Sequence, residues 1–271
     1  MAAVGPYQCA LITGASSGIG AEFARQLAPV SKELVLVARR VDLLDALSSE
    51  IEGQFNDIKV HCIQADLTEG QDFEDLVSSI QSAGLHPDLL INNAGMGDYG
   101  EFKSADWAKV ETMIRLNMEV LTRLTHCMLP SMINARSGSI INVSSLASVL
   151  PIPDFAVYAA SKAYVTSFSE ALRIELADQG IKVMALCPGP VHTGFGEVAQ
   201  RGSASNVTPG GEIVYVECKQ VVKEAINAIE KGKARHYPGK IIGLMATLFH
   251  LLPVTLIRKL MQRRPRRKSQ S

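Results

Sequence analysis

The chain of 271 residues lacks the features of several protein classes. Lys plus Arg and Asp plus Glu are equal at 27 each, so no overall charge attracts nucleic acid, and we expect none as a partner. The cysteines are odd in number and form no CxxC pair, which argues against a disulfide framework and a metal site: Cys9, Cys62, Cys127, Cys187 and Cys218. With 47% hydrophobic and 20% charged residues, the composition is typical of a folded globular protein.

Acidic side chains are absent after Glu230. Residues 231–271 carry 11 of the 27 Lys and Arg residues, so the first 230 residues hold 16 basic and 27 acidic side chains. Any electrostatic partner therefore concerns the C-terminal segment alone. The first apolar run has no basic segment before it, so we expect no secretory signal, and the scattered thiols favour a reducing, cytoplasmic location.

Short apolar runs rich in Val, Ile and Leu alternate with longer amphipathic segments. The runs predict buried strands over residues 8–13, 33–38, 59–65, 88–92, 139–143 and 181–187. Helical periodicity predicts helices over residues 21–28, 42–52, 72–83, 107–134, 156–178 and 218–231. Because the spacings are too long for hairpins, we expect a parallel sheet with helices on both faces. The predicted fold class is α/β, a single doubly wound Rossmann-type domain with about seven strands.

A glycine-rich turn follows the first predicted strand and reads Thr13-Gly14-Ala15-Ser16-Ser17-Gly18-Ile19-Gly20. Glycines in such a turn let the backbone approach a pyrophosphate closely and let the next helix pack on the sheet. The phosphate then lies on unpaired N–H groups at the positive end of that helix. A plain βα turn is the alternative, but the position in the first βα unit favours a dinucleotide site formed by Gly14, Ser16, Ser17, Gly18, Ile19 and Gly20.

Further motifs follow this turn in order. Asn92-Asn93-Ala94-Gly95 ends the fourth predicted strand, Tyr158 and Lys162 form a YxxxK pair, and Ser145 precedes the tyrosine by 13 residues. Pro188-Gly189, followed by Thr193, comes after the sixth predicted strand. Together with the Gly-x-x-x-Gly-x-Gly spacing, this pattern resembles the compact branch of the short-chain dehydrogenase/reductase family over roughly residues 8–193. The resemblance implies an oxidoreductase in which Asn117 holds a water in a proton relay.

Tyr158 and Lys162 are four positions apart, so on a helix their side chains share one face. A nearby ammonium is expected to lower the pKa of the phenol toward the working range, making Tyr158 a general acid for a carbonyl or a general base for an alcohol. Ser145 is expected to polarise the substrate oxygen, whereas Ser144 points the opposite way because side chains alternate at a strand end. The family resemblance selects Ser145 and gives Lys162 a second role on the nicotinamide ribose.

The end of the second predicted strand favours NADP(H) as the cofactor. A carboxylate there would bind the ribose 2′-hydroxyl of NAD, but Ala38 occupies that position, and the planar donor fork of Arg39 suits a phosphate. Ser17 departs from the NADP pattern, which often has a second basic residue in the turn. Arg39 and Arg40 as solvated helix-cap residues are the alternative. By resemblance, the remaining cofactor contacts are Asp66, Leu67, Asn93, Ala94, Gly95, Tyr158, Lys162, Pro188, Gly189, Val191 and Thr193.

The substrate side is predicted to come from residues 194–214, whose Gly, Ser and Pro content indicates a binding loop. The side chains of Phe195 and Val198, together with Met96 and Leu146, are apolar and favour a lipophilic ketone, alcohol or acyl chain. The leading hypothesis is an NADP(H)-dependent oxidoreductase that moves a hydride between nicotinamide and a carbonyl or secondary alcohol. A dinucleotide-binding sensor or scaffold without turnover is the alternative. The family resemblance also implies a homo-oligomer.

The C-terminal segment falls outside this pattern. Residues 241–257 form a mainly apolar run of 17 positions interrupted by Gly243, His250 and Pro253, which is marginal for a membrane span of about 20 residues. Seven basic side chains follow in residues 258–268. We expect a catalytic, dinucleotide-binding domain over residues 1–240 and an appended segment over residues 241–271. A flap or oligomer contact is the first interpretation of that segment, a peripheral membrane anchor the second, and a disordered tail the third.

Overall fold

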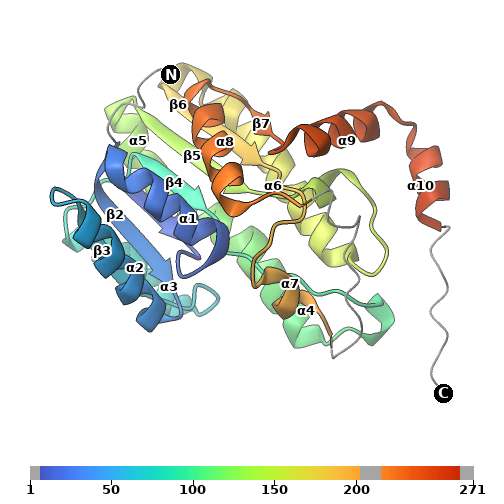
Figure 1. Cartoon of the computed structure of the whole chain (residues 1–271), viewed down its shortest axis with the longest axis horizontal. Coiled ribbons are helices and arrows are strands. Elements are labelled where there is room, and N and C mark those ends of the chain that lie inside the picture. The colour runs from blue at the N-terminus through green and yellow to red at the C-terminus, as the bar shows by residue number, and fades with distance from the viewer. Residues whose placement is uncertain (1–6, 202–214, 263–271) are drawn as a thin grey trace.

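A sheet of seven parallel strands forms the centre of the computed structural model, which describes residues 7–201 and 215–262 (Figure 1). The strand order is β3-β2-β1-β4-β5-β6-β7. The strands are β1 (Tyr7–Thr13), β2 (Ser31–Ala38), β3 (Lys59–Gln64), β4 (Leu89–Asn92), β5 (Gly138–Val143), β6 (Ile181–Leu186) and β7 (Arg235–His236). The chain first winds outward from β1 to β3 and then, from β4, in the opposite direction. This order confirms the predicted doubly wound Rossmann-type fold.

Helices cover both faces of the sheet (Figure 1). They are α1 (Gly18–Leu27), α2 (Val41–Gln54), α3 (Gly70–Ser82), α4 (Trp107–Ile114), α5 (Leu121–Ala135), α6 (Ala156–Glu175), α7 (Phe195–Ala199), α8 (Cys218–Glu230), α9 (Lys240–Leu251) and α10 (Val254–Gln262). Ala10 and Ile12 face the core formed with α1, α2, α8 and α9, whereas Leu11 faces the core formed with α3, α5 and α6. Successive strand residues thus enter opposite cores, which explains the unbroken apolar runs in the sequence.

The six predicted strands agree with the structure to within two residues at each end. The seventh strand lies outside those runs. It consists of Arg235 and His236 alone, which pair with Ala185 and Leu186 of β6. Two residues are too few to show a periodic pattern, so this strand depends on its neighbour rather than on its own sequence.

The long helix predicted over residues 107–134 is divided in three. After α4, Arg115–Val120 wind as a π-helix (η3), and α5 continues from Leu121. Short π-helical segments are rare and are found frequently at functional sites. This one carries Asn117, whose side chain is buried.

The apolar run over residues 241–257 also forms two helices rather than one. Leu252, between α9 and α10, is extended at φ −75° and ψ 135°, as expected for a residue that precedes a proline. No helix within residues 7–201 and 215–262 is long and apolar enough to cross a membrane. Of the predicted binding loop over residues 194–214, the first part contains α7, and residues 202–214 lie outside the described residues.

Helix α1 packs closely against the end of β1, and this packing fixes the glycine-rich turn. A Cβ atom at Gly20 would lie 2.3 Å from the carbonyl oxygen of Gly14 and 2.6 Å from Nδ2 of Asn93. No side chain larger than hydrogen fits there without moving backbone. The first turn of α1 therefore sits directly on the carboxyl ends of β1 and β4.

Gly20→Ala is expected to displace this turn, to lower the free energy of unfolding by about 1–3 kcal/mol as overpacking usually does, and to weaken dinucleotide binding. Gly53→Ala is the control, because a Cβ atom at that position of α2 meets nothing within 4 Å. The control should stabilise the protein by up to about 1 kcal/mol through helix propensity. Urea unfolding and nucleotide fluorescence titration measure both effects, and equal stability of the two variants would contradict the packing argument.

Candidate active site

The site begins where the strand order reverses, between β1 and β4. Thr13 Oγ1 accepts hydrogen bonds of 3.0 Å from the backbone N–H groups of both Asn93 and Ala94. The side-chain amide of Asn93 in turn donates to the carbonyl oxygens of Thr13 (2.9 Å) and Gly14 (3.2 Å). The Asn93 side chain thus ties the glycine-rich turn to the end of β4. A crevice at such a reversal is the place where open α/β sheets bind ligands.

The N-terminus of α1 has the features of an anion site. Ser17, the residue before the helix, makes no side-chain capping hydrogen bond, and no acidic residue occupies the first turn. The unpaired N–H groups and the helix dipole there favour a negatively charged group. Thr193 lies across the turn, because a Cβ atom at Gly18 would be 3.0 Å from its methyl carbon. Two predicted cofactor segments, 14–20 and the one that contains Thr193, therefore meet.

Two arginines follow β2, and they have different partners. Arg40 donates from Nη2 to Ser16 Oγ (3.0 Å) and Ser17 Oγ (2.8 Å), over the glycine-rich turn. Arg39 instead points toward Asp66, with 3.5 Å between Nη1 and Oδ2. The end of the second strand predicts Arg39, and not Arg40, as the phosphate contact. Side chains of neighbouring residues point in different directions at a strand end, so Arg39 and Arg40 cannot share one partner. The serines of the turn could have indicated that Arg40 would point toward it.

Arg39 and Asp66 line a cavity of about 370 Å³ together with Gln64 and Asp72. Burial acts to raise the pKa of Asp66, but hydrogen bonds from Thr68 and the Arg39 charge outweigh it, so the pKa lies below its ordinary value. The ionised carboxylate is an acceptor suited to an amino group. Leu67, the other predicted residue here, packs its side chain into the core and offers only backbone.

The predicted polar residues Ser145, Tyr158 and Lys162 meet at the carboxyl end of β5. The hydroxyl of Ser145 hydrogen-bonds the phenol of Tyr158 and accepts from the N–H of Ala147 at 3.1 Å. Ser144 points the other way, donating to the carbonyl oxygen of Lys162 at 2.8 Å. The two serines therefore separate as side-chain alternation predicts, and Ser145 is the one that reaches the tyrosine.

Burial dominates the ionisation of this group. It raises the pKa of Tyr158 to about 12, with the Ser145 hydrogen bond acting in the opposite direction, and it lowers the pKa of Lys162 to about 8. The expectation that the Lys162 charge depresses the tyrosine pKa is wrong for this structure. Lys162 Nζ donates to the carbonyl oxygen of Val143 at 2.9 Å and lies 5.7 Å from the centre of the phenol ring. Because both side chains are buried, the free-energy cost of charging either of them outweighs the attraction between an ammonium and a phenolate.

Asn117 completes the polar group from the π-helical segment. Its Nδ2 donates to the carbonyl oxygen of Met96 (2.9 Å) and to Ser161 Oγ (3.0 Å), and its Oδ1 accepts from the N–H of Met96 (3.0 Å). A Cβ atom at Gly95 would lie 3.1 Å from Asn117 Oδ1 and 3.4 Å from Lys162 Nζ. The side chain of Asn117 thus positions the segment after β4 beside Lys162. A water relay through this residue stays a prediction.

An aromatic cluster surrounds Tyr158 on the expected substrate side. Phe155 stacks on the phenol ring at 4.2 Å between centroids, Phe195 lies at 5.5 Å, and Tyr99 contacts Phe155 at 5.7 Å. Phe195 and Met96 were expected here, whereas Phe155 and Tyr99 were not, since nothing in their local sequence links them to Tyr158. Leu146 faces the main core instead, and the side chain of Val198 lies outside the described residues.

A buried ion pair ties α7 to the loop after β4. Arg201 binds the carboxylate of Asp98 through Nε (2.8 Å) and Nη2, and Lys109 adds a contact of 3.2 Å. The Asp98 side chain is only 2% exposed, and the Arg201 hydrogen bond is the main cause that holds its pKa below the ordinary value. Beside this pair, the N–H of Tyr99 donates to the carbonyl oxygen of Ala199 at 2.7 Å. These contacts hold Phe195 against the tyrosine.

The remaining predicted cofactor residues follow β6. The carbonyl oxygen of Pro188 accepts from the N–H of Leu146 at 2.8 Å, and Val191 forms an isolated bridge with Val216. Gly189 lies against α9, because a Cβ atom there would be 2.5 Å from Ile242 Cδ1. The segment is thus placed beside Ser145 by one contact and beside the C-terminal helix by another.

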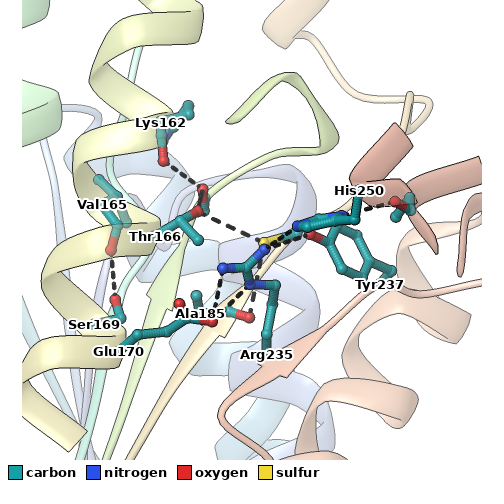
Figure 2. Close-up of polar contacts among 12 residues, drawn as sticks. Lys162, Val165, Thr166, Ser169, Glu170, Ala185, Arg235, Tyr237 and His250 are labelled. Carbon is teal, nitrogen blue, oxygen red and sulfur yellow. Dashed lines mark hydrogen bonds and ion pairs between the residues drawn. The ribbon is translucent and has the colours of Figure 1, made fainter. Parts of the chain in front are cut away.

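A second polar network joins α6 to β7 and α9 (Figure 2). Arg235 donates to Glu170 (2.8 Å) and to the hydroxyl of Tyr237 (3.0 Å), and it contacts His250 at 2.7 Å. A cavity of about 410 Å³ adjoins it, but none of the predicted catalytic residues lines that cavity. The network holds α9 on α6, and we assign it no chemistry.

These features are those of a Rossmann-type α/β protein whose polar side chains gather at the carboxyl edge of the sheet. A family model described as short chain dehydrogenase matches residues 8–203, and the chain belongs to this family. The sulfoacetaldehyde reductase of Chromohalobacter salexigens is 36% identical over 192 residues, which cover 69% of this chain and 74% of the relative. The bovine very-long-chain 3-oxoacyl-CoA reductase is 32% identical over 73% of this chain and 64% of its own length. A short-chain dehydrogenase from Sphingobium yanoikuyae, solved with NADPH, has a TM-score of 0.78 at 29% identity, with 97% of this chain and 98% of that chain covered.

Arg201→Met is expected to release α7 from the loop after β4, because it leaves the buried Asp98 without its main partner. Because Lys109 still contacts the carboxylate, the loss of the Arg201 hydrogen bonds is expected to cost about 1.5–3 kcal/mol. The double variant Asp98→Asn/Arg201→Met should recover much of the lost stability, since it removes the buried charge as well. Thermal unfolding of the two variants and of the exposed-pair control Arg25→Met measures this, and a loss for Arg201→Met no larger than for Arg25→Met would contradict the clamp.

Proposed function

We propose that this protein is an NADP(H)-dependent reductase of a lipophilic carbonyl compound. The observation that carries the proposal is the convergence of Ser145, Tyr158 and Lys162 at the carboxyl edge of the sheet, next to the glycine-rich turn. The fit of a dinucleotide is supported by the N-terminus of α1, whose first turn is packed too closely for any side chain at Gly20. The NADPH-bound structural relative supports the same cofactor.

The nicotinamide cofactor, when bound, supplies a hydride and is oxidised as the carbonyl carbon is reduced. Tyr158 gives the phenol proton to the substrate oxygen, so that a C=O group becomes CH–OH. A phenol whose pKa is about 12 keeps its proton at neutral pH and is suited to donate it to a forming alkoxide. Ser145 orients the substrate oxygen, and the Lys162 ammonium stabilises the negative charge left on the phenol. By microscopic reversibility, the same side chains would return the proton to Tyr158 in the oxidation of an alcohol.

The preference for NADP(H) rests on the two arginines after β2. The Arg40 guanidinium lies over the hydroxyl groups of Ser16 and Ser17. These three side chains bring hydrogen-bond donors together at the edge of the glycine-rich turn. Arg39 borders the neighbouring cavity and has a side chain that is 74% exposed, free to turn toward a phosphate. We assign the 2′-phosphate to Arg40 and the turn serines, with Arg39 as a second contact.

The lipophilic character of the substrate is inferred from the aromatic cluster of Tyr99, Phe155 and Phe195 around Tyr158. These rings give the approach to the phenol an apolar wall, with the Asp98 carboxylate already neutralised by Arg201. The two curated relatives are named for very different substrates, sulfoacetaldehyde and a very-long-chain oxoacyl-CoA. The wall fits a long or bulky apolar chain better than a small sulfonate.

Tyr158→Phe is expected to bind NADPH with nearly unchanged affinity and to lose about two to four orders of magnitude in kcat on hydrophobic ketones. Tyr164→Phe is the matched control: it lies on the same helix, and its hydroxyl contacts Thr122 at 2.8 Å, away from the site. Steady-state turnover and fluorescence titration measure both. Wild-type turnover by Tyr158→Phe would refute the proton-donor role. A wild-type protein that binds NADPH but reduces no ketone of a broad panel would favour the sensor alternative.

Arg40→Ala is expected to raise the Kd of NADPH roughly 10- to 100-fold, the range for losing charge-assisted hydrogen bonds, and to change the Kd of NADH by less than about threefold. Arg39→Ala should act in the same direction with a smaller effect. Arg25→Ala, an exposed arginine paired with Glu50, serves as the control. Equal weakening of both nucleotides by Arg40→Ala would show that this residue does not distinguish the 2′-phosphate.

A further inference from the structure

Helix α9 has two apolar faces, and among residues 7–201 and 215–262 only one of them packs against the rest of the protein. Ile242 and Ala246 are fully buried in the main core, where Met245 and Phe249 pack beside them. Ile242 also contacts Gly189 next to the candidate active site. The inner face of α9 thus belongs to the main core, and the network around Arg235 fixes the helix in this orientation (Figure 2).

The outer face of α9 carries an exposed aliphatic stripe. Its members recur at spacings of three or four residues along one side of the helix: Ile241 (49% exposed), Leu244 (72%), Leu248 (53%) and Leu251 (77%). Leu256 on α10 is also exposed, at 42%. Figure 1 places α9 and α10 at the β7 end of the sheet, away from α2 and α3. A contiguous apolar surface of this kind on a folded protein marks an interaction site.

The charged residues of α9 and α10 themselves are all basic. Lys240 begins α9, Arg258 and Lys259 are exposed on α10, and the sequence adds five further basic residues within positions 263–268. No acidic residue occurs anywhere after Glu230, although the first 230 residues carry 27. An apolar stripe with a basic margin is the pattern of a helix that lies in the interface of an anionic bilayer.

We propose that the outer face of α9, together with Leu256, Arg258 and Lys259 of α10, forms a docking surface for an anionic lipid bilayer. A second copy of this chain is a poorer occupant, because pairing these faces would bring together two segments with 11 basic and no acidic side chains each. Anionic headgroups compensate this charge, while the leucines enter the acyl boundary. The docking is peripheral and independent of the reaction proposed above.

Flotation of the full chain with vesicles tests this surface. We expect binding to vesicles of phosphatidylcholine with 30% phosphatidylglycerol, at least about fivefold weaker binding to pure phosphatidylcholine, and loss of binding at high salt. Leu244→Gln/Leu248→Gln should reduce the partition coefficient at least about tenfold, since two exposed side chains no longer enter the acyl boundary. The control Ile174→Gln, an isoleucine 77% exposed on α6, should leave it unchanged.

A second double variant measures the electrostatic contribution to vesicle binding. Arg258→Gln/Lys259→Gln should lower the partition coefficient about 25-fold, or about fivefold for each basic residue near an anionic surface. Lys219→Gln/Lys223→Gln on the exposed face of α8 is the matched control and should leave partition within about twofold. Circular dichroism and NADPH titration establish that each variant is folded.

Three results would overturn the proposal. The first is no binding of the wild type to anionic vesicles, and the second is equal binding to neutral and anionic vesicles. The third is an unchanged partition coefficient for Leu244→Gln/Leu248→Gln. If the wild type fails to bind and the same double variant lowers the molecular mass measured by light scattering, the stripe is an interface between copies of this chain.

Discussion

The hydrogen bonds between Thr13 and the segment after β4 are the constraint on which the rest of the site depends. One hydroxyl accepts from two successive backbone N–H groups, and the Asn93 amide closes the connection to the glycine-rich turn. This connection joins two strands that are neighbours in the sheet but nearly 80 residues apart in the chain. It places Gly95 beside Asn117 and Lys162, so the cofactor turn and the polar group around Tyr158 take their relative positions from the same few bonds.

Burial is what gives those polar side chains their chemistry. Tyr158 and Lys162 lie at the end of a sheet covered on both faces, and desolvation moves their pKa values in opposite directions, each toward the neutral form. A protonated phenol and a lysine that titrates near neutral pH are suited to passing a proton outward. Asp98 is equally enclosed, but its two basic partners keep it ionised. Burial thus favours the neutral form of Tyr158 and Lys162, whereas the ion pairs of Asp98 keep that carboxylate charged.

The C-terminal helices pack at the β7 end of the sheet and give that end of the molecule a different surface. The inner face of α9 completes the core next to Gly189, and Arg235 connects it to α6. The outer face carries exposed aliphatic side chains, and the charged residues of α9 and α10 are all basic. The molecule therefore has a mainly acidic body and one basic, apolar end, and that end lies beside the segment that follows β6.

Local patterns in the sequence determined six of the seven strands of the sheet, the glycine-rich turn, the YxxxK pair and the family, because hydrophobic period and motif spacing are properties of short segments. The choice of Ser145 over Ser144 required the family resemblance as well. Only the tertiary structure decided that Arg40 reaches the turn, that Phe155 and Tyr99 surround Tyr158, and that burial raises the tyrosine pKa to about 12. The physical reason is that these properties arise from contacts between distant segments and from desolvation, and neither leaves a periodic trace in the chain.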